Sequence, residues 1–262
     1  MTESSASCLR GRIYFHERRN VMYGFKVIAE GDYASFTRPE MKVERVSYDV
    51  PTPGALEGML KSVYWKPPIR YVIDRIIVFN PIDFVNIRRN EVSEKVPLSS
   101  VKSNMNGGGR DISIYTSECR SQRASMVLKN VRYGIEFHFE LTGVKDEYES
   151  DGEKKHFNII KRRLENGQHF RTPCFGCSEF PVKRLTLVED FDLSQISSEV
   201  LAAGDVDLGY MLYRMSFADG GKPVNGDWES PKFSDSATAV YYRPHMINGV
   251  IDVAGYSEGI VC

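Results

Sequence analysis

A lysine and a histidine are adjacent at Lys155-His156, where the segment KKHFNIIKRRLENG predicts the first turn of a helix. The first N–H groups of a helix lack backbone partners and its dipole favours anions, so cations and an imidazole there form a good phosphate site. The same dipole favours the neutral imidazole that a general base needs. The alternative is an ordinary basic, solvated helix face with His156 on the surface. The residues alone leave both interpretations open.

Other candidates for phosphate chemistry are scattered along the chain. Tyr48 lies just before another predicted helix and offers a phenolic hydroxyl, although a lone tyrosine more often packs in a core. The triplet Gly107-Gly108-Gly109 could follow a phosphate backbone closely, but it has neither Walker nor dinucleotide spacing and is equally typical of a flexible loop. Arginines in the same stretch are better candidates for phosphate contacts, or else ordinary surface residues. They are Arg88, Arg89, Arg120 and Arg123.

Residues that could hold a metal do not form a recognisable set. Cys174 and Cys177 make one CxxC, with His169 five residues before Cys174, but a structural zinc needs a second ligand pair at suitable spacing. The sequence also lacks the GxSxG motif of serine hydrolases and the HExxH motif of metalloproteases. It has no convincing aspartate cluster for two-metal nuclease chemistry. We therefore expect no metal and no cofactor. The five cysteines are mostly scattered, which favours a reducing, cytoplasmic compartment.

The elements that must position these residues follow a regular order. Apolar alternation predicts four strands. These strands span about 23–36, 71–79, 135–141 and 180–188. A first helix begins at Thr52-Pro53, a capping residue and a proline suited to the first helical position, and the KKHF helix ends at Gly167. The order β-α-β-β-α-β predicts an α+β, ferredoxin-like domain of the kind that RNA-recognition modules use.

Two further stretches complete the predicted organisation. Periodicity fades between about 81 and 130, which predicts an inserted β-hairpin with a mobile tip. Three more strands are expected near the C-terminal end, the last two joined near Asn248-Gly249. They span about 208–217, 237–242 and 250–253. The predicted division is an unassigned extension 1–20, a ferredoxin-like domain 21–190, and a small antiparallel β-rich domain 191–262.

Charge is distributed unevenly, although the net charge of the 262 residues is only -1. Residues 1–185 carry 30 cationic and 23 acidic side chains, a net +7, whereas residues 186–262 carry 4 and 12, a net -8. A basic body beside an acidic region favours a polyanionic ligand and a separate protein-facing part. Because no apolar run approaches the roughly 20 residues of a membrane span and none forms a leader, we expect no membrane association.

Several segments are distinctive enough to indicate a family. The most specific are SYDVPTPGALEG and SVYWKP, and the others are IRRNEV, ECRSQRASMVLKNVRYGIEFHFEL and GEKKHFNIIKRRLENGQHFRTPCFGCSEFPV. Together they resemble the CRISPR-associated fifth family of the RAMP superfamily in its subtype I-C, or Dvulg, form. The resemblance is strong from about Phe25 to Val188 and looser beyond. Residues 1–20 have no counterpart in it.

The resemblance implies a ferredoxin-like domain followed by a small β-rich domain. It also implies a metal-independent endoribonuclease that cuts CRISPR precursor RNA at the base of the repeat hairpin. The enzyme would then hold the 5′ handle of the crRNA in the antiviral Cascade complex, with its backbone and large subunits as partners. The family's cleavage residues are a tyrosine in the SY-x-VPT segment and a Lys-His pair, which correspond to Tyr48, Lys155 and His156.

The expected reaction is attack by a 2′-hydroxyl on the adjacent phosphorus, which leaves a 2′,3′-cyclic phosphate. His156 would be the general acid or base, Lys155 would stabilise charge on phosphorus, and Tyr48 would position the nucleophile. RNA contacts are expected from residues near this pair and in the excursion. They are Lys154, Arg162, Arg163, Arg88, Arg89, Arg120, Arg123, Gly107, Gly108 and Gly109.

Two other functions remain to be weighed. A crRNA-binding Cascade scaffold without cleavage activity is the first, and the intact Lys-His pair argues against it. The second is a recognition module for unrelated RNA. It is disfavoured because the predicted strands lack the GFGFV-like aromatic signature.

Overall fold

The computed structural model describes residues 24–41, 43–109, 112–142, 152–219, 224–227 and 232–256, and the predicted extension 1–20 lies outside them. The helices are α1 (Pro53–Val63), α2 (Leu98–Met105), α3 (Gly152–Glu165) and α4 (Ser198–Ala202), with 3-10 turns η1 (Leu193–Gln195) and η2 (Ala254–Tyr256). The longer strands are β1 (Gly24–Ala34), β3 (Ile69–Val78), β4 (Phe84–Val92), β5 (Arg120–Leu141), β6 (Arg184–Val188), β8 (Met211–Phe217) and β9 (Ala237–Tyr242). The short strands are β2 (Arg45–Val46), β7 (Asp205–Asp207), β10 (His245–Ile247) and β11 (Val250–Asp252).

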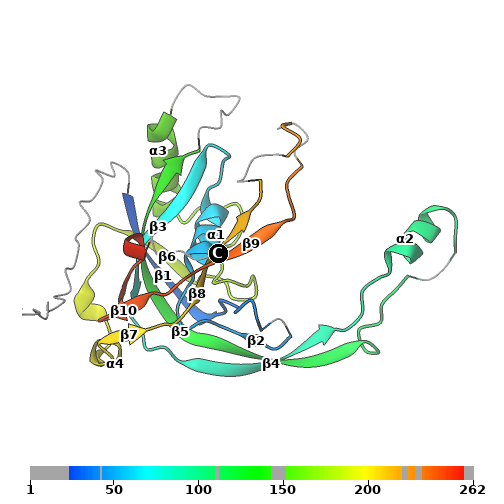
Figure 1. The fold of residues 1–262 in the computed structure, drawn as a ribbon, viewed down its shortest axis with the longest axis horizontal. Coiled ribbons are helices and arrows are strands. Elements are labelled where there is room, and N and C mark those ends of the chain that lie inside the picture. The colour runs from blue at the N-terminus through cyan, green and yellow to red at the C-terminus, as the bar shows by residue number, and fades with distance from the viewer. Residues whose placement is uncertain are drawn as a thin grey trace, which may run out of the picture.

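A mostly antiparallel sheet forms the centre of the molecule (Figure 1), with neighbouring strands in the order β6-β1-β5-β3-β11-β10-β7. Its middle is apolar, because Val27 of β1 lies opposite Ile135 of β5, and Ile135 in turn lies opposite Ile76 of β3. All three side chains are fully buried. β5 is far longer than the predicted strand 135–141, since its first half is polar and hides the alternation.

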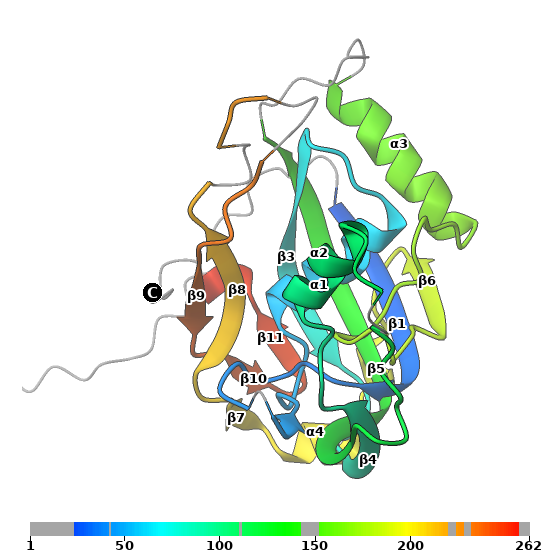
Figure 2. The same ribbon diagram turned by 90° about the vertical axis from the view of Figure 1, so that its right-hand side faces the viewer.

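Helix α1 packs against β3 and β8, and helix α3 packs against β6, as Figure 2 shows for α3. Thr52 accepts the N–H of Ala55 at the start of α1, and Pro53 occupies the first turn, as predicted. Helix α3 is anchored by Phe157, whose ring stacks on Phe25 with 4.9 Å between centroids. Its last helical residue is Glu165, and Gly167 follows with a φ of 62°, which suits a glycine at a helix end.

The predicted excursion is a long arm that runs to the right of Figure 1, built from β4, the first half of β5 and α2. Antiparallel pairing extends from Phe84 opposite Leu128 to Val92 opposite Arg120. Helix α2 was not expected from the sequence, because no apolar face marks it, and none of its residues is buried. The arm therefore exposes most of its side chains.

Three short C-terminal strands, β7, β10 and β11, join the same sheet. β11 pairs with β3, and Ile196, Tyr242 and Ile251 belong to the same buried cluster as Val27 and Ile135. Sheet and core thus both cross the boundary predicted near residue 190. β8 and β9 form a separate two-stranded sheet.

The turn Asn248-Gly249 joins β10 to β11, not the predicted strand 237–242 to 250–253, because the short strand β10 intervenes. Both turn residues have positive φ, 51° and 81°, as expected for this dipeptide in a hairpin. Within the described ranges, no helix is long and apolar enough to cross a bilayer.

Candidate functional site

Tyr64 and His156 meet at the end of α1 where α3 begins. The Tyr64 hydroxyl is 2.9 Å from Nδ1 of His156, and only about 5% of each residue's surface is exposed. The Phe139 ring of β5 approaches the imidazole edge-on, with 6.4 Å between centroids. The structure thus holds a phenol and an imidazole together in a largely apolar wall.

The backbone around Tyr64 explains why its side chain points away from α1. Tyr64 caps the helix with extended backbone angles, while its N–H still donates to the carbonyl of Leu60. The Tyr71 hydroxyl on β3 donates to the Tyr64 carbonyl at 2.7 Å. Pro67-Pro68 then prevents the helix from continuing. Tyr64 is therefore fixed by hydrogen bonds at both its N–H and its carbonyl.

This pair has the chemistry of a proton-transfer site. A phenol bonded to an imidazole can donate or accept a proton according to the imidazole tautomer. A histidine within hydrogen-bond reach of a reacting hydroxyl is the commonest general acid or base. Proximity to the N-terminal end of α3 also favours a phosphate over a cationic substrate.

Lys155 and His156 do lie at the beginning of a helix, as predicted, although α3 starts at Gly152 and places them in its first four or five residues. Lys155 is half-buried beside the histidine, and Lys154 is exposed. Ser150 and Asp151, which precede α3, lie outside the described residues. The two lysines bring positive charge to the pair.

Tyr48, the tyrosine predicted from the family motif, has a different environment. Its hydroxyl accepts the N–H of Leu212 in β8 at 3.2 Å, and the Arg38 guanidinium lies 4.7 Å from its ring centre. Burial is the main reason that the pKa of its hydroxyl is raised. Tyr48 precedes α1 whereas Tyr64 follows it, and eleven helical residues span about 16 Å. The structure therefore brings Tyr64, and not Tyr48, to His156.

Tyr64 is not among the site residues predicted from the sequence, for a physical reason. It stands four residues after Leu60 on the apolar face of the predicted helix, a position typical of core packing. The signal was nevertheless present, because Tyr64 belongs to SVYWKP, one of the two most specific segments. Trp65, its neighbour, is half exposed, which is unusual for such a large apolar side chain.

The four predicted arm arginines divide between two faces of the β4–β5 ladder. Arg89 donates to Glu179 at 2.5 Å and lies 3.2 Å from Glu91, and Arg123 also pairs with Glu91. Arg88 and Arg120 lie on the other face and are exposed, and within the described ranges no ion pair involves either of them. Only this second pair presents charge outward.

The predicted glycine triplet ends helix α2 at the tip of the arm. Gly107 has a φ of 89° and donates to Asn104, while the Gly108 N–H bonds the Ser103 carbonyl at 2.9 Å. A Cβ at Gly108 would lie 2.6 Å from the Ser103 hydroxyl oxygen. Helix termination alone thus accounts for glycine at the first two positions.

The remaining predicted features fall into two groups. Arg163 contacts Val63 and Tyr64, whereas Arg162 is exposed on the adjacent side of α3. Cys174 and Cys177 are free thiols, and burial raises the pKa of Cys174. Across the described ranges, no three His, Cys, Asp or Glu side chains gather as a metal-ligand set.

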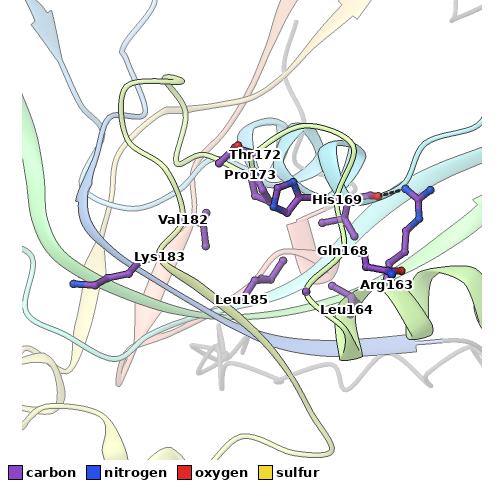
Figure 3. A pocket seen from close by; sticks show the side chains of 11 residues that line it. Arg163, Leu164, Gln168, His169, Thr172, Pro173, Val182, Lys183 and Leu185 are labelled. Carbon is purple, nitrogen blue, oxygen red and sulfur yellow. Dashed lines mark hydrogen bonds between the residues drawn. The ribbon is translucent and has the colours of Figure 1, made fainter.

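A pocket lies between the end of α1, the C-terminal end of α3 and strand β6 (Figure 3), and neither Tyr64 nor His156 is among the residues that line it. Its floor is apolar, with Leu164, Val182 and Leu185, and cationic or titratable groups line its edges. The Arg163 side chain lines this pocket, and its guanidinium also covers the face of the Tyr64 ring. Arg163 therefore lies between the pocket and Tyr64. Apolar floor and basic rim together suit a nucleotide better than a purely apolar ligand.

Comparison with known proteins identifies the family. The sequence profile described as CRISPR-associated protein (Cas_Cas5) matches residues 25–254. The chain therefore belongs to this CRISPR-associated family, as the resemblance indicated.

Two curated relatives share the description "CRISPR pre-crRNA endoribonuclease Cas5d". The Mannheimia succiniciproducens protein is 42% identical over 227 residues, which is 85% of this chain and 91% of the relative. The Thermus thermophilus protein is 36% identical over 204 residues, which is 77% of this chain and 78% of the relative.

Two solved structures share the fold. A crystal structure of a CRISPR-associated protein aligns with a TM-score of 0.54 at 24% identity, covering 91% of this chain and 96% of the other. A functionally uncharacterized protein from Streptococcus mutans aligns with a TM-score of 0.57 at 22% identity, covering 91% and 97%. The mixed α/β architecture with a mostly antiparallel sheet is thus common to all three proteins.

Proposed function

We propose that this protein is a CRISPR precursor-RNA endoribonuclease that cuts within the repeat, near the base of its hairpin. The observation that carries the proposal is the 2.9 Å contact between the Tyr64 hydroxyl and His156, next to Lys155. Membership of the family and the description of both curated relatives support the same activity.

In the proposed reaction, the 2′-hydroxyl upstream of the scissile bond attacks the adjacent phosphorus. The 2′-oxygen–phosphorus bond forms, the bond from phosphorus to the 5′-oxygen breaks, and the products are a 2′,3′-cyclic phosphate and a 5′-hydroxyl. One proton leaves the 2′-hydroxyl and one reaches the departing 5′-oxygen. All atoms come from the RNA, so the step needs neither water nor a metal-bound oxygen.

The residues have distinct proposed roles. The Tyr64–His156 pair takes up and returns the protons. Lys155 stabilises the negative charge that grows on the oxygens around phosphorus. Tyr64 takes the place first assigned to Tyr48, because the Tyr48 hydroxyl is engaged with Leu212.

RNA is proposed to reach the pair from the exposed basic side of α3 and from the arm. Lys154 and Arg162 are exposed near the pair, and Arg88 and Arg120 line the outward face of the arm. Single-stranded RNA is commonly held by such cations together with exposed aromatic rings, and Trp65 is half exposed beside Tyr64. Gly107, Gly108 and Gly109 at the arm tip remain candidates for backbone contacts.

The finer architectural and cellular assignments belong to the same proposal. The order β6-β1-β5-β3, with α1 and α3 in the connections, is consistent with a ferredoxin-like domain. After cleavage, the protein is proposed to keep the 5′ handle of the crRNA as a subunit of Cascade, with backbone and large subunits as partners. A cytoplasmic location follows from that role.

A repeat RNA with one 2′-deoxy nucleotide just upstream of the scissile phosphate tests the reaction. It should bind normally and remain uncut, because the attacking atom is missing while the phosphate and shape contacts remain. Wild-type RNA should be cut equally with and without a chelator. Efficient cleavage of the deoxy substrate at the normal position would contradict 2′-hydroxyl attack, since a metal-activated water would ignore that substitution. Binding without any cleavage of normal RNA would instead support the Cascade scaffold.

A further inference from the structure

Arg163 occupies a protected place between the two helices that carry the pair. Its Nη1 donates to the carbonyl of Val63, the last residue of α1, at 2.5 Å. Its guanidinium carbon lies 5.3 Å from the centre of the Tyr64 ring. Figure 3 shows the Arg163 side chain at the pocket edge with this hydrogen bond drawn. One guanidinium thus holds both the helix end and the ring that follows it.

The spacing along α3 places this contact on the same side as the histidine. Arg163 follows His156 by seven residues, about two helical turns, and Ile160 between them is buried. The side chain of Tyr64 therefore meets α3 at two points, through its hydroxyl at His156 and through its ring face at Arg163. Contact at both points leaves the phenol little freedom to rotate away.

The physical effect of the guanidinium is twofold. The Val63 carbonyl is one of the acceptors that a helix leaves unpaired at its C-terminal end, and a cation there is favourable. A guanidinium over an aromatic face adds a cation–π attraction that a flexible lysine reproduces poorly. Because one N–H of the guanidinium is bonded to Val63 and its face covers the Tyr64 ring, its arrangement fits support of Tyr64 better than the predicted role as a phosphate contact.

We propose that Arg163 is a positioning residue that holds the Tyr64 hydroxyl against Nδ1 of His156. The proposal rests on the proposed RNA cleavage at this pair, but it also has a consequence in the free protein. A positive charge near the pair disfavours a further proton on it. Removal of that charge should therefore make the imidazole easier to protonate.

The test compares three full-length variants. Arg163→Gln removes the charge, Arg163→Lys keeps it without the planar fork, and Lys161→Gln removes an equal charge from α3. Lys161 is a matched control because it is exposed and pairs with Glu165, one turn further along the helix. Single-turnover cleavage of repeat RNA is measured at saturating protein across pH. The His156 ring titration is followed by NMR without RNA, and thermal unfolding verifies that each variant folds.

Arg163→Gln should lower the saturated cleavage rate by about tenfold, because the phenol loses its fixed position. It should also move the pH–rate profile and the His156 titration upward, because a nearby positive charge is lost. Arg163→Lys should recover most of the pH shift but only part of the rate. Lys161→Gln should leave the rate at saturation and both titrations at wild-type values.

An Arg163→Gln protein that loses RNA affinity while its saturated rate and His156 titration match Lys161→Gln would overturn the proposal in favour of a phosphate contact. If Arg163→Gln fails to fold, the Arg163→Lys variant tests the proposal instead. A saturated cleavage rate of Arg163→Lys equal to that of the wild type would contradict a positioning role. If wild-type protein cuts no RNA, the proposed function fails. An unshifted NMR titration would then still count separately against Arg163.

Discussion

The Tyr64–His156 site and the β4–β5 arm both contain cationic side chains that the sequence predicted to contact RNA. The two regions differ in whether those side chains are bound to other protein groups or exposed. At the site, Arg163 is bound to protein groups, and a phenol and an imidazole are held in a buried wall. On the arm, Arg88 and Arg120 are exposed on one face of a ladder whose other face is neutralised by acids. Packing provides the fixed geometry that proton transfer requires, whereas an exposed ribbon provides charge without such geometry.

The largest expected effect is that of removing the imidazole. His156→Ala should reduce cleavage by at least about 10²-fold, the low end for a positioned acid–base group, with RNA affinity within a few-fold of wild type. Tyr64→Phe should reduce the rate in the same assay, because it removes the hydroxyl bonded to Nδ1. Tyr48→Phe should mainly lower stability, by about 1 kcal/mol, through its lost bond to Leu212. Normal cleavage by Tyr64→Phe beside a strong loss in Tyr48→Phe would return the role to Tyr48.

Alanine substitutions at two glycines compare the stability of the packed body with that of the arm. Gly249 has a φ of 81°, and an added Cβ would lie 2.8 Å from Val200 Cγ1 and 3.0 Å from the Val78 carbonyl oxygen. Gly249→Ala should therefore lower the free energy of unfolding by about 2–4 kcal/mol, from left-handed strain and overpacking together. Gly107→Ala should cost only about 1 kcal/mol, because its φ of 89° is strained but its surroundings are open. Denaturant unfolding measures both, and equal losses would show that packing adds nothing at Gly249.

The smallest expected effect concerns the two faces of the arm. Arg88→Gln with Arg120→Gln should weaken RNA binding several-fold and reduce the log–log salt slope by about 1.4, for two lost contacts to single-stranded phosphates. Arg89→Gln with Arg123→Gln should change the slope little, because those side chains pair with Glu91 and Glu179. Filter binding over a range of salt measures both slopes. Equal decreases would show that RNA displaces the acids from Arg89 and Arg123.

Local signals in the sequence predicted elements well where one side of an element is apolar and its ends carry capping residues. Thr52-Pro53 marked the start of α1, Gly167 the end of α3, and Asn248-Gly249 a tight turn, because each depends on a few adjacent backbone angles. Helix α2 escaped detection, since a helix without a buried face leaves no periodic pattern. The length of β5 was underestimated for the same reason, because its half in the arm is polar.

The sequence by itself therefore determined the family, the position of Lys155-His156 at the beginning of a helix, and the existence of a long excursion between two strands. Only the tertiary structure decided that β11 completes the sheet beside β3. The same holds for the arginine pair that faces outward and for the tyrosine that reaches His156. Tyr64 and His156 are 92 residues apart, and no local pattern encodes a contact over that separation. Their meeting depends on how the end of α1 packs against the start of α3, because burial of the apolar faces of both helices sets that approach.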